Sequence, residues 1–119
     1  MILVVDDDDD VREMVTTALE SRGYTVRTAS SGSAALEVLE TEQPCLVLLD
    51  LVMPGVDGFA VMQQLHARAR ADIPVCVLSA LPEKAPPGVV GTLRKPFALA
   101  DLIALADRYC TAEHHGAGV

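Results

Sequence analysis

The chain has 119 residues, half of them hydrophobic, which suits one domain with a single buried core and argues against a disordered protein. Its 17 acidic and 9 basic residues give a net charge of −8, so we expect a metal cation or a basic protein surface as a partner rather than nucleic acid. No apolar run approaches the roughly 20 residues of a membrane-spanning helix, and the chain starts without the basic segment of a signal peptide, so neither a membrane span nor secretion is expected.

Strand and helix patterns alternate from the start of the chain. Residues 2–5 form an apolar run, which predicts a buried strand. Apolar residues then recur at helical spacing, and Val11 and Met14 are predicted to be core residues of this helix. The aspartates at positions 8–10 precede or open the helix and are interpreted as a solvated cap. Residues 24–29 alternate in polarity, as a half-buried edge strand does.

The same alternation continues through the middle of the chain. Ser31 can cap a second helix, and the apolar run 46–49 predicts a buried strand that leads into Asp50. Residues 53–58 have the composition of a turn, and Asp57 is interpreted as serving this turn rather than a metal. A third amphipathic helix follows.

Two further strands and a last helix complete the pattern. The apolar run 75–78 leads into Ser79, and the shorter run 89–93 is followed by Lys95. The last helix carries Leu99 and further apolar residues at helical spacing.

Five strands that alternate with helices predict an α/β fold with a parallel sheet covered on both faces. Among the topologies that right-handed crossovers allow, we expect the flavodoxin-like, doubly wound order 2-1-3-4-5. Residues 1–110 are predicted to form this domain, and residues 111–119 a flexible tail.

Polar residues stand at the carboxyl ends of the predicted strands, at the edge where open α/β sheets bind ligands. They are Asp6 and Asp7 after the first strand, Asp50 after the third, Ser79 after the fourth and Lys95 after the fifth. Like charges about 4 Å apart repel by roughly 4 kcal/mol at an effective dielectric near 20, so such a carboxylate cluster needs a counter-charge.

Mg²⁺ is the cation that fits this cluster best, because it is a hard ion that carboxylates hold together with phosphate oxygens. A lysine and a hydroxyl beside an acidic metal site suit phosphoryl transfer, which depends on positioning and charge neutralisation. A carboxylate can itself be the nucleophile, and the site contains no other strong one.

The number and spacing of the cysteines indicate the redox state of the cellular compartment. Cys45 and Cys76 lie in apolar runs and are predicted to be small core residues. Together with Cys110 they are odd in number and widely spaced, and we expect neither a metal site nor a disulfide framework from them. A reducing cytoplasm fits this usage best.

The chain resembles the receiver domain of two-component response regulators up to about Tyr109. Four segments carry the resemblance, in family order, and together they are specific. They are Ile2-Leu3-Val4-Val5-Asp6-Asp7-Asp8, Leu48-Leu49-Asp50-Leu51-Val52-Met53-Pro54-Gly55-Val56-Asp57-Gly58, Val77-Leu78-Ser79-Ala80 and Lys95-Pro96-Phe97.

The resemblance implies a role for each site residue. Asp50 is expected to accept a phosphoryl group from a phosphohistidine on a histidine kinase or phosphotransfer protein. Mg²⁺ is expected on Asp7 directly, on Asp6 through water, on Asp50, and on the backbone carbonyl of Val52. Ser79 and Lys95 are expected to contact the phosphoryl group. Receiver domains act on their own carboxylate, so an enzyme acting on separate substrates is not expected.

The resemblance also implies secondary features. The start of the first helix, with Val11 and Met14, helps to dock the histidine-bearing partner in this family, and the bond before Pro96 is typically cis. Val52 and Leu81 flank the path of the hydrolytic water, and because both are apolar we expect a long-lived phosphoaspartate.

Two departures from the family pattern concern the output face. Ser79 and Lys95 are closer in sequence than in most receiver domains, and the eight residues 81–88 include three prolines and a glycine. Because proline in a helix interior costs about 3 kcal/mol, the fourth helix of the family is expected to be absent or one turn at most. Thr92 stands where the family has an aromatic residue coupled to the switch hydroxyl Ser79, so we expect output without an aromatic switch, through a downstream protein that the sequence does not identify.

Three alternatives stay open at this point. A degenerate receiver would act as an interaction module without phosphorylation. A phosphatase of the haloacid dehalogenase type would use Asp6, rather than Asp50, as its nucleophile. A flavodoxin-like electron carrier would need a phosphate-binding loop after the first strand, where this chain has five aspartates.

Overall fold

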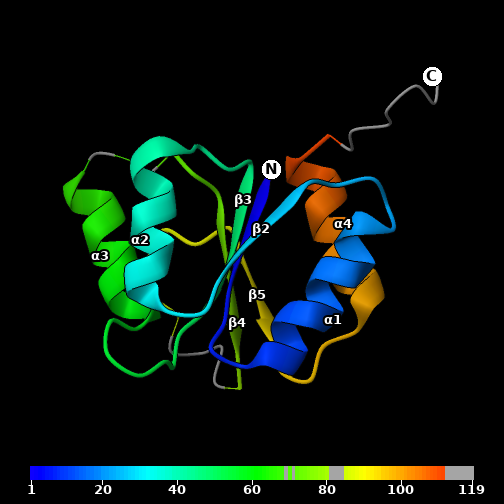
Figure 1. Ribbon diagram of the computed structural model, residues 1–119, viewed down its shortest axis with the longest axis horizontal. Helices are drawn as coiled ribbons and strands as arrows, with labels where there is room; N and C mark the ends of the chain where they lie inside the picture. Colours follow the sequence, from blue (N-terminus) through cyan, green and yellow to red (C-terminus); the bar gives the residue numbers. More distant parts are fainter. Residues whose placement is uncertain (69, 71, 81–84, 112–119) are drawn as a thin grey trace.

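A computed structural model describes residues 1–68, 70, 72–80 and 85–111. Strands and helices alternate through most of it (Figure 1), as the sequence pattern predicts. The elements are β1 (Ile2–Val5), α1 (Asp9–Glu20), β2 (Val26–Ala29), α2 (Gly32–Thr41), β3 (Leu46–Asp50), α3 (Gly58–Ala67), β4 (Val75–Ser79), β5 (Gly91–Arg94) and α4 (Leu99–Tyr109).

The five strands form one parallel sheet in the order β2-β1-β3-β4-β5, which confirms the predicted topology. The register pairs Val5 with Leu49, Asp50 with Leu78 and Ser79 with Arg94. The carboxyl ends of β1, β3, β4 and β5 therefore lie together, at the lower edge of the sheet in Figure 1.

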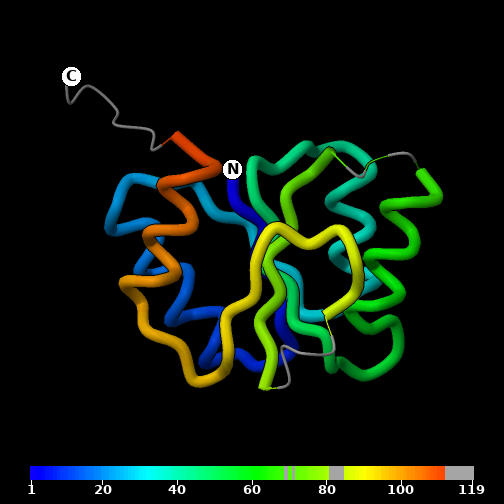
Figure 2. The backbone as a smooth tube through the Cα atoms, turned by 180° about the vertical axis from the view of Figure 1, so that it is seen from behind, coloured from blue at the N-terminus to red at the C-terminus, as the bar shows by residue number. Residues whose placement is uncertain are grey.

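Helices cover both faces of the sheet: α2 and α3 lie on one side and α1 and α4 on the other (Figures 1 and 2). Successive side chains of a strand point to opposite faces. Leu3 and Val5 of β1 accordingly pack in the cluster beneath α2 and α3, whereas Ile2 and Val4 pack beneath α1 and α4. Every residue of β1, β3 and β4 is buried, which explains why these strands are continuous apolar runs.

Side-chain caps fix the starts of three helices. Asp8 caps α1 by accepting from the backbone N–H groups of Asp10 and Val11, and Ser31 caps α2, as predicted for both regions. Asp57, which the sequence placed in a turn, caps α3. Such caps satisfy backbone donors that the first helical turn leaves unpaired.

The connection between β4 and β5 contains no helix over residues 85–90, in agreement with the predicted loss of the fourth helix of the family. Residues 81–84, including Leu81, lie outside the described residues. Gly88 in this connection has φ of +91°, a left-handed conformation that glycine adopts without strain.

Two sequence predictions are wrong in the structure. Met14 is 42 % exposed, because α1 buries Val15 and Leu19 and turns its neighbour Met14 away from the sheet. Cys45 is only half-buried and forms a disulfide with Cys110, although no disulfide was expected from the cysteine pattern. Cys76 is fully buried in the core, as predicted.

None of the helices within the described ranges is both long and apolar enough to cross a membrane. Most of the predicted tail, residues 112–119, lies outside those ranges.

Candidate functional site

The sequence-predicted acidic residues come together at the carboxyl edge of the sheet. One carboxylate oxygen from each of Asp6, Asp7 and Asp50 lies within 4.8 Å of the others. Asp6 is fully buried and Asp50 nearly so, whereas Asp7 is exposed to solvent. A cluster of hard oxygen donors with one solvent-facing member fits Mg²⁺, which keeps water ligands and binds through few carboxylates.

Lys95 supplies the counter-charge that the acidic cluster requires. Its Nζ lies 2.7 Å from Oδ2 of Asp6 and 3.5 Å from Oδ2 of Asp50. Burial alone lowers the pKa of Lys95, but the hydrogen bond to Asp6 and the charges of Asp50 and Asp6 outweigh it and raise that pKa. The ammonium group is therefore charged at neutral pH and joins two buried carboxylates.

Asp50 is held in an energetically unfavourable ionised state. Burial, and then the negative charge of Asp6, raise the pKa of Asp50 to about 6, against the opposing effects of the Val52 backbone N–H and of Lys95. Desolvation and a like charge both disfavour a carboxylate. A bound cation, or a reaction that removes the negative charge, would relieve this cost. Asp50 is therefore the carboxylate of the cluster that we select as the candidate reactive group.

One backbone and one side-chain donor at the start of α1 fix the orientation of Asp6. The N–H of Asp8 donates to Oδ1 of Asp6 at 2.9 Å, and the guanidinium of Arg12 donates to the Asp6 carbonyl at 2.6 Å. Arg12 also pairs with Asp9 in the first turn of the helix. Arg12 is a positioning residue that sequence reasoning missed, since its contact depends on how α1 packs against the end of β1.

The turn after β3 holds Asp50 and Val52 together. The Val52 N–H donates to Oδ1 of Asp50 at 3.2 Å, and the Val52 side chain is 73 % exposed beside the acidic cluster. The expectation that the Val52 carbonyl binds the metal stays a prediction.

The shortened connection between β4 and β5 still leaves Ser79 and Lys95 next to each other. The N–H of Lys95 donates to the Ser79 carbonyl at 2.9 Å, and Ser79 is buried at the end of β4. The Lys95–Pro96 peptide bond is cis, as the family resemblance implied. Thr92 lies elsewhere: it pairs with Val77 and is exposed on β5, outside the acidic site.

Gly58 is a second residue whose role the sequence did not reveal. Its N–H donates to the Leu51 carbonyl at 3.1 Å, and a Cβ built on it would lie 2.5 Å from the backbone carbonyl oxygen of Asp50. A glycine after a turn signal is so common that composition alone could not show this close approach.

Replacing Gly58 with alanine is expected to lower the free energy of unfolding by about 2 kcal/mol or more, because backbone atoms of Asp50 and Leu51 cannot yield as a flexible side chain can. Urea unfolding of the two proteins measures the difference. Ala60→Gly on the same helix should cost about 1 kcal/mol through helix propensity alone. Equal stability of Gly58→Ala and the unmodified chain would contradict the close approach.

Residues 2–107 match the family model described as response regulator receiver domain. With this fold and this arrangement of acidic residues and lysine, the chain belongs to the receiver domains of the response regulators of two-component systems.

Two curated relatives illustrate the sequence similarity. The chain is 41 % identical over 109 residues to the response regulator MprA of Mycobacterium ulcerans (strain Agy99), covering 87 % of this chain and 47 % of that protein. It is 48 % identical over 82 residues to the probable transcriptional regulator ycf27 of Pyropia yezoensis, covering 69 % of this chain and 33 % of that protein. The chain thus spans between a third and a half of the length of these relatives.

Solved structures match over nearly the whole chain. The receiver domain of NtrX from Brucella abortus superposes with a TM-score of 0.82 at 32 % identity, covering 92 % of this chain and 97 % of that one. A putative response regulator from Chloroflexus aurantiacus superposes with a TM-score of 0.83 at 28 % identity, covering 91 % and 94 %.

Proposed function

We propose that the domain accepts a phosphoryl group on Asp50 from a phosphohistidine donor, in a reaction that requires Mg²⁺. One observation carries the proposal: three carboxylates converge within 4.8 Å, and Lys95 bridges the two buried ones. Receiver domains generally bind Mg²⁺ in an acidic pocket, and this cluster has the donor atoms for it.

Asp6, Asp7 and Asp50 are the side chains that would hold Mg²⁺, together with the backbone carbonyl of Val52. When bound, Mg²⁺ supplies neutralisation of the charge on the transferred phosphoryl oxygens.

The chain's own residues then account for the transfer step. A carboxylate oxygen of Asp50 forms a bond to phosphorus while the phosphorus–nitrogen bond of the donor breaks, and the electron pair of that bond stays on the leaving imidazole. Lys95 pairs with one phosphoryl oxygen and the Ser79 hydroxyl donates to another, so both act by positioning and charge. The protein modifies only its own carboxylate, so we do not propose an enzyme that acts on other substrates.

A degenerate receiver is not supported, because every side chain that phosphorylation requires is present, the three carboxylates converge, and Lys95 pairs with Asp6 and Asp50. The carboxylates after β1 also make a poor site for the phosphate of a flavin. The phosphatase alternative differs in its nucleophile, Asp6, which is fully buried and bound to Lys95.

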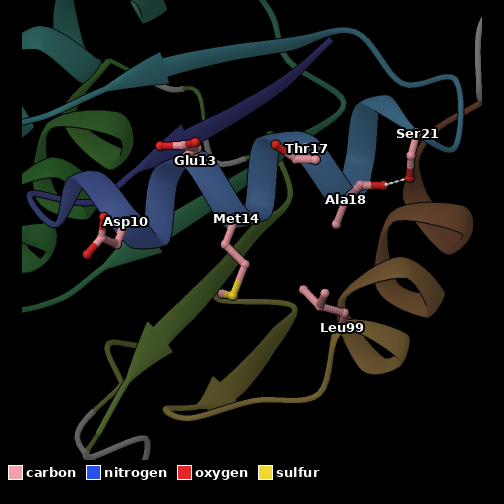
Figure 3. A pocket seen from close by; sticks show the side chains of 7 residues that line it. All are labelled: Asp10, Glu13, Met14, Thr17, Ala18, Ser21 and Leu99. Carbon is pink, nitrogen blue, oxygen red and sulfur yellow. Dashed lines mark hydrogen bonds between the residues drawn. The ribbon is translucent and has the colours of Figure 1, made fainter.

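The exposed face of α1 is the surface that we assign to the histidine-bearing partner. A groove of about 490 Å³ lies between α1 and the start of α4, with Met14 and Leu99 as apolar residues and Asp10 and Glu13 as acidic ones (Figure 3). The exposure of Met14, unexpected for a core residue, supports this docking role. The acidic rim favours a partner with a basic rim.

Output is proposed to run through a protein partner in the cytoplasm without an aromatic relay, since Thr92 is exposed on β5 and has no ring to move inward. The net charge of −8 does not favour nucleic acid as the partner of this segment. The relatives named as transcriptional regulators are longer than this chain, and we do not transfer their transcriptional function to it.

The proposal is tested by incubating the protein with acetyl phosphate and Mg²⁺ and measuring its intact mass. We expect the addition of one phosphoryl group, lost when EDTA removes the metal and lost in Asp50→Asn. Asp57→Asn is the matched control, because asparagine also caps a helix and this variant should be phosphorylated normally. If neither acetyl phosphate nor a phosphohistidine donor adds a phosphoryl group, phosphorylation of this domain is refuted.

Replacing Val52 with asparagine is expected to shorten the lifetime of the phosphoaspartate several-fold, because an amide at this exposed position can orient water that the valine excludes. The decay of phosphorylated protein after removal of the donor measures the rate. Val52→Leu, which stays apolar, should decay as slowly as the unmodified chain. Equal rates for Val52→Asn and Val52→Leu would show that this side chain does not control water access.

A further inference from the structure

A disulfide lies at the sheet edge opposite the acidic site. Cys45 directly precedes β3 and Cys110 caps the carboxyl end of α4, and their sulfurs are bonded with 5.5 Å between the Cα atoms. The Cys45 N–H also donates to the Met1 carbonyl at 2.9 Å, which fixes this cysteine beside β1. The bond therefore ties the end of α4 to the amino edge of the sheet.

We propose that Cys45 and Cys110 form a reversible thiol–disulfide switch that fastens the carboxyl end of α4 to the sheet. The bond joins positions 65 residues apart, and the closed segment contains Asp50, Ser79 and Lys95. In a reducing compartment an intracellular disulfide is usually transient and responds to redox conditions, so the oxidised form would mark oxidising conditions.

The exchange partner that we assign is a small disulfide such as oxidised glutathione. One protein thiolate attacks a sulfur of that disulfide and releases one glutathione thiol. The second protein thiolate then displaces the other glutathione, so two protein thiols are oxidised to one disulfide while one glutathione disulfide is reduced to two thiols. Reduction by excess dithiol reverses both steps.

Exposure explains why this pair, and not the third cysteine, would exchange. Cys45 and Cys110 are half-buried and border the core beneath α1 and α4, so a small thiol can reach them. Cys76 is fully buried, and burial raises the pKa of its thiol to about 12, which leaves almost no thiolate at neutral pH.

The disulfide lies far from the acidic cluster, so opening it is expected to affect α4 rather than the phosphorylation site. Cys45 and Asp50 are at opposite ends of β3, so opening the bond removes no contact of the acidic cluster. Near its carboxyl end, α4 keeps the hydrogen bond from Tyr24 to Asp107 and the ion pair of Arg22 with Asp107. We therefore expect reduction to loosen the last turn of α4 and to lower stability, with phosphorylation at Asp50 unchanged.

The bond itself is tested on the full chain after incubation with oxidised glutathione. The protein is denatured without reductant, alkylated with iodoacetamide and weighed intact. We expect one alkyl group, on Cys76, and three after treatment with dithiothreitol. Three groups before reduction, or covalent dimers in place of the intramolecular bond, would overturn the proposal.

The effect on stability is tested by thermal unfolding with and without dithiothreitol. Reduction should lower the melting temperature by about 10 °C or more. The double variant Cys45→Ser with Cys110→Ser should not respond to reductant, whereas Cys76→Ala should keep the full response. A response that persists in the double variant, or none in the unmodified protein, would overturn the switch. Phosphorylation of the reduced protein is measured in parallel, so that failure of the switch and failure of phosphorylation are separate results.

Discussion

Replacement of Asp50 by asparagine is expected to abolish phosphorylation and, in the absence of Mg²⁺, to raise the free energy of unfolding at pH 7.5 by about 2 kcal/mol. Asparagine has the shape of aspartate but neither its charge nor its nucleophilic oxygen. It removes an anion that is buried, that faces Asp6, and whose pKa is raised to about 6. A gain in stability with complete loss of function is the expected signature of a strained functional carboxylate.

The stability gained by Asp50→Asn is expected to depend on pH. The folded protein holds a proton on Asp50 up to about pH 6, whereas the unfolded chain loses it near pH 4. Between these values the folded state binds more protons, so the contribution of Asp50 to stability falls as pH rises through this window. The advantage of Asp50→Asn should therefore be absent below about pH 4 and complete above about pH 7.

Urea unfolding at several pH values, with EDTA present, measures the difference. Asp57→Asn should match the unmodified protein within about 0.5 kcal/mol, because both residues cap α3. Adding Mg²⁺ should stabilise the unmodified domain more than Asp50→Asn. A variant that is less stable than the parent at pH 7.5 without metal would show that Asp50 carries no ionisation cost.

Replacement of Lys95 by methionine is the second change with a large expected effect. The ammonium group bridges Asp6 and Asp50, so its removal leaves two buried carboxylates without their counter-charge. Breaking one partner of a buried pair costs about 3 kcal/mol, and we expect a loss of this order in the free energy of unfolding without metal. Phosphorylation should slow by at least about a hundred-fold, since a positioned positive charge near the phosphoryl group is lost.

The same variant should bind Mg²⁺ more tightly, because a competing positive charge has left the acidic cluster. Thermal unfolding across a Mg²⁺ titration measures both affinity and stability. Arg94→Met is the matched control: Arg94 is the preceding residue, is exposed on β5, and should change neither property appreciably. Weaker Mg²⁺ binding in Lys95→Met would contradict the assignment of Lys95 as the counter-charge.

Much of the fold could be predicted because burial imposes a simple pattern. β1, β3 and β4 are buried on both faces, so their residues form continuous apolar runs, and polar residues follow where each strand reaches solvent. In a parallel sheet these ends meet at one edge, which is why Asp6, Asp50 and Lys95 could be placed together before their contacts were known.

The features that the sequence did not reveal all depend on how elements pack. The disulfide joins Cys45 to Cys110 across 65 residues, and an odd number of cysteines gives no pairing by itself. Met14 shares the apolar spacing of α1, yet the helix turns Val15 and Leu19 to the core instead. Gly58 looks like an ordinary turn residue until the backbone of Asp50 is seen against it.

The carboxylate that carries the phosphoryl group can be identified chemically. The protein is incubated with acetyl phosphate and Mg²⁺, reduced with borohydride, which converts a phosphoaspartate to homoserine, and digested for peptide mass mapping. We predict homoserine at position 50 alone, with Asp6 and Asp7 intact. Homoserine at position 6 would indicate a nucleophile after β1, as in the phosphatase alternative, and would contradict the assignment of Asp50 as phosphoacceptor.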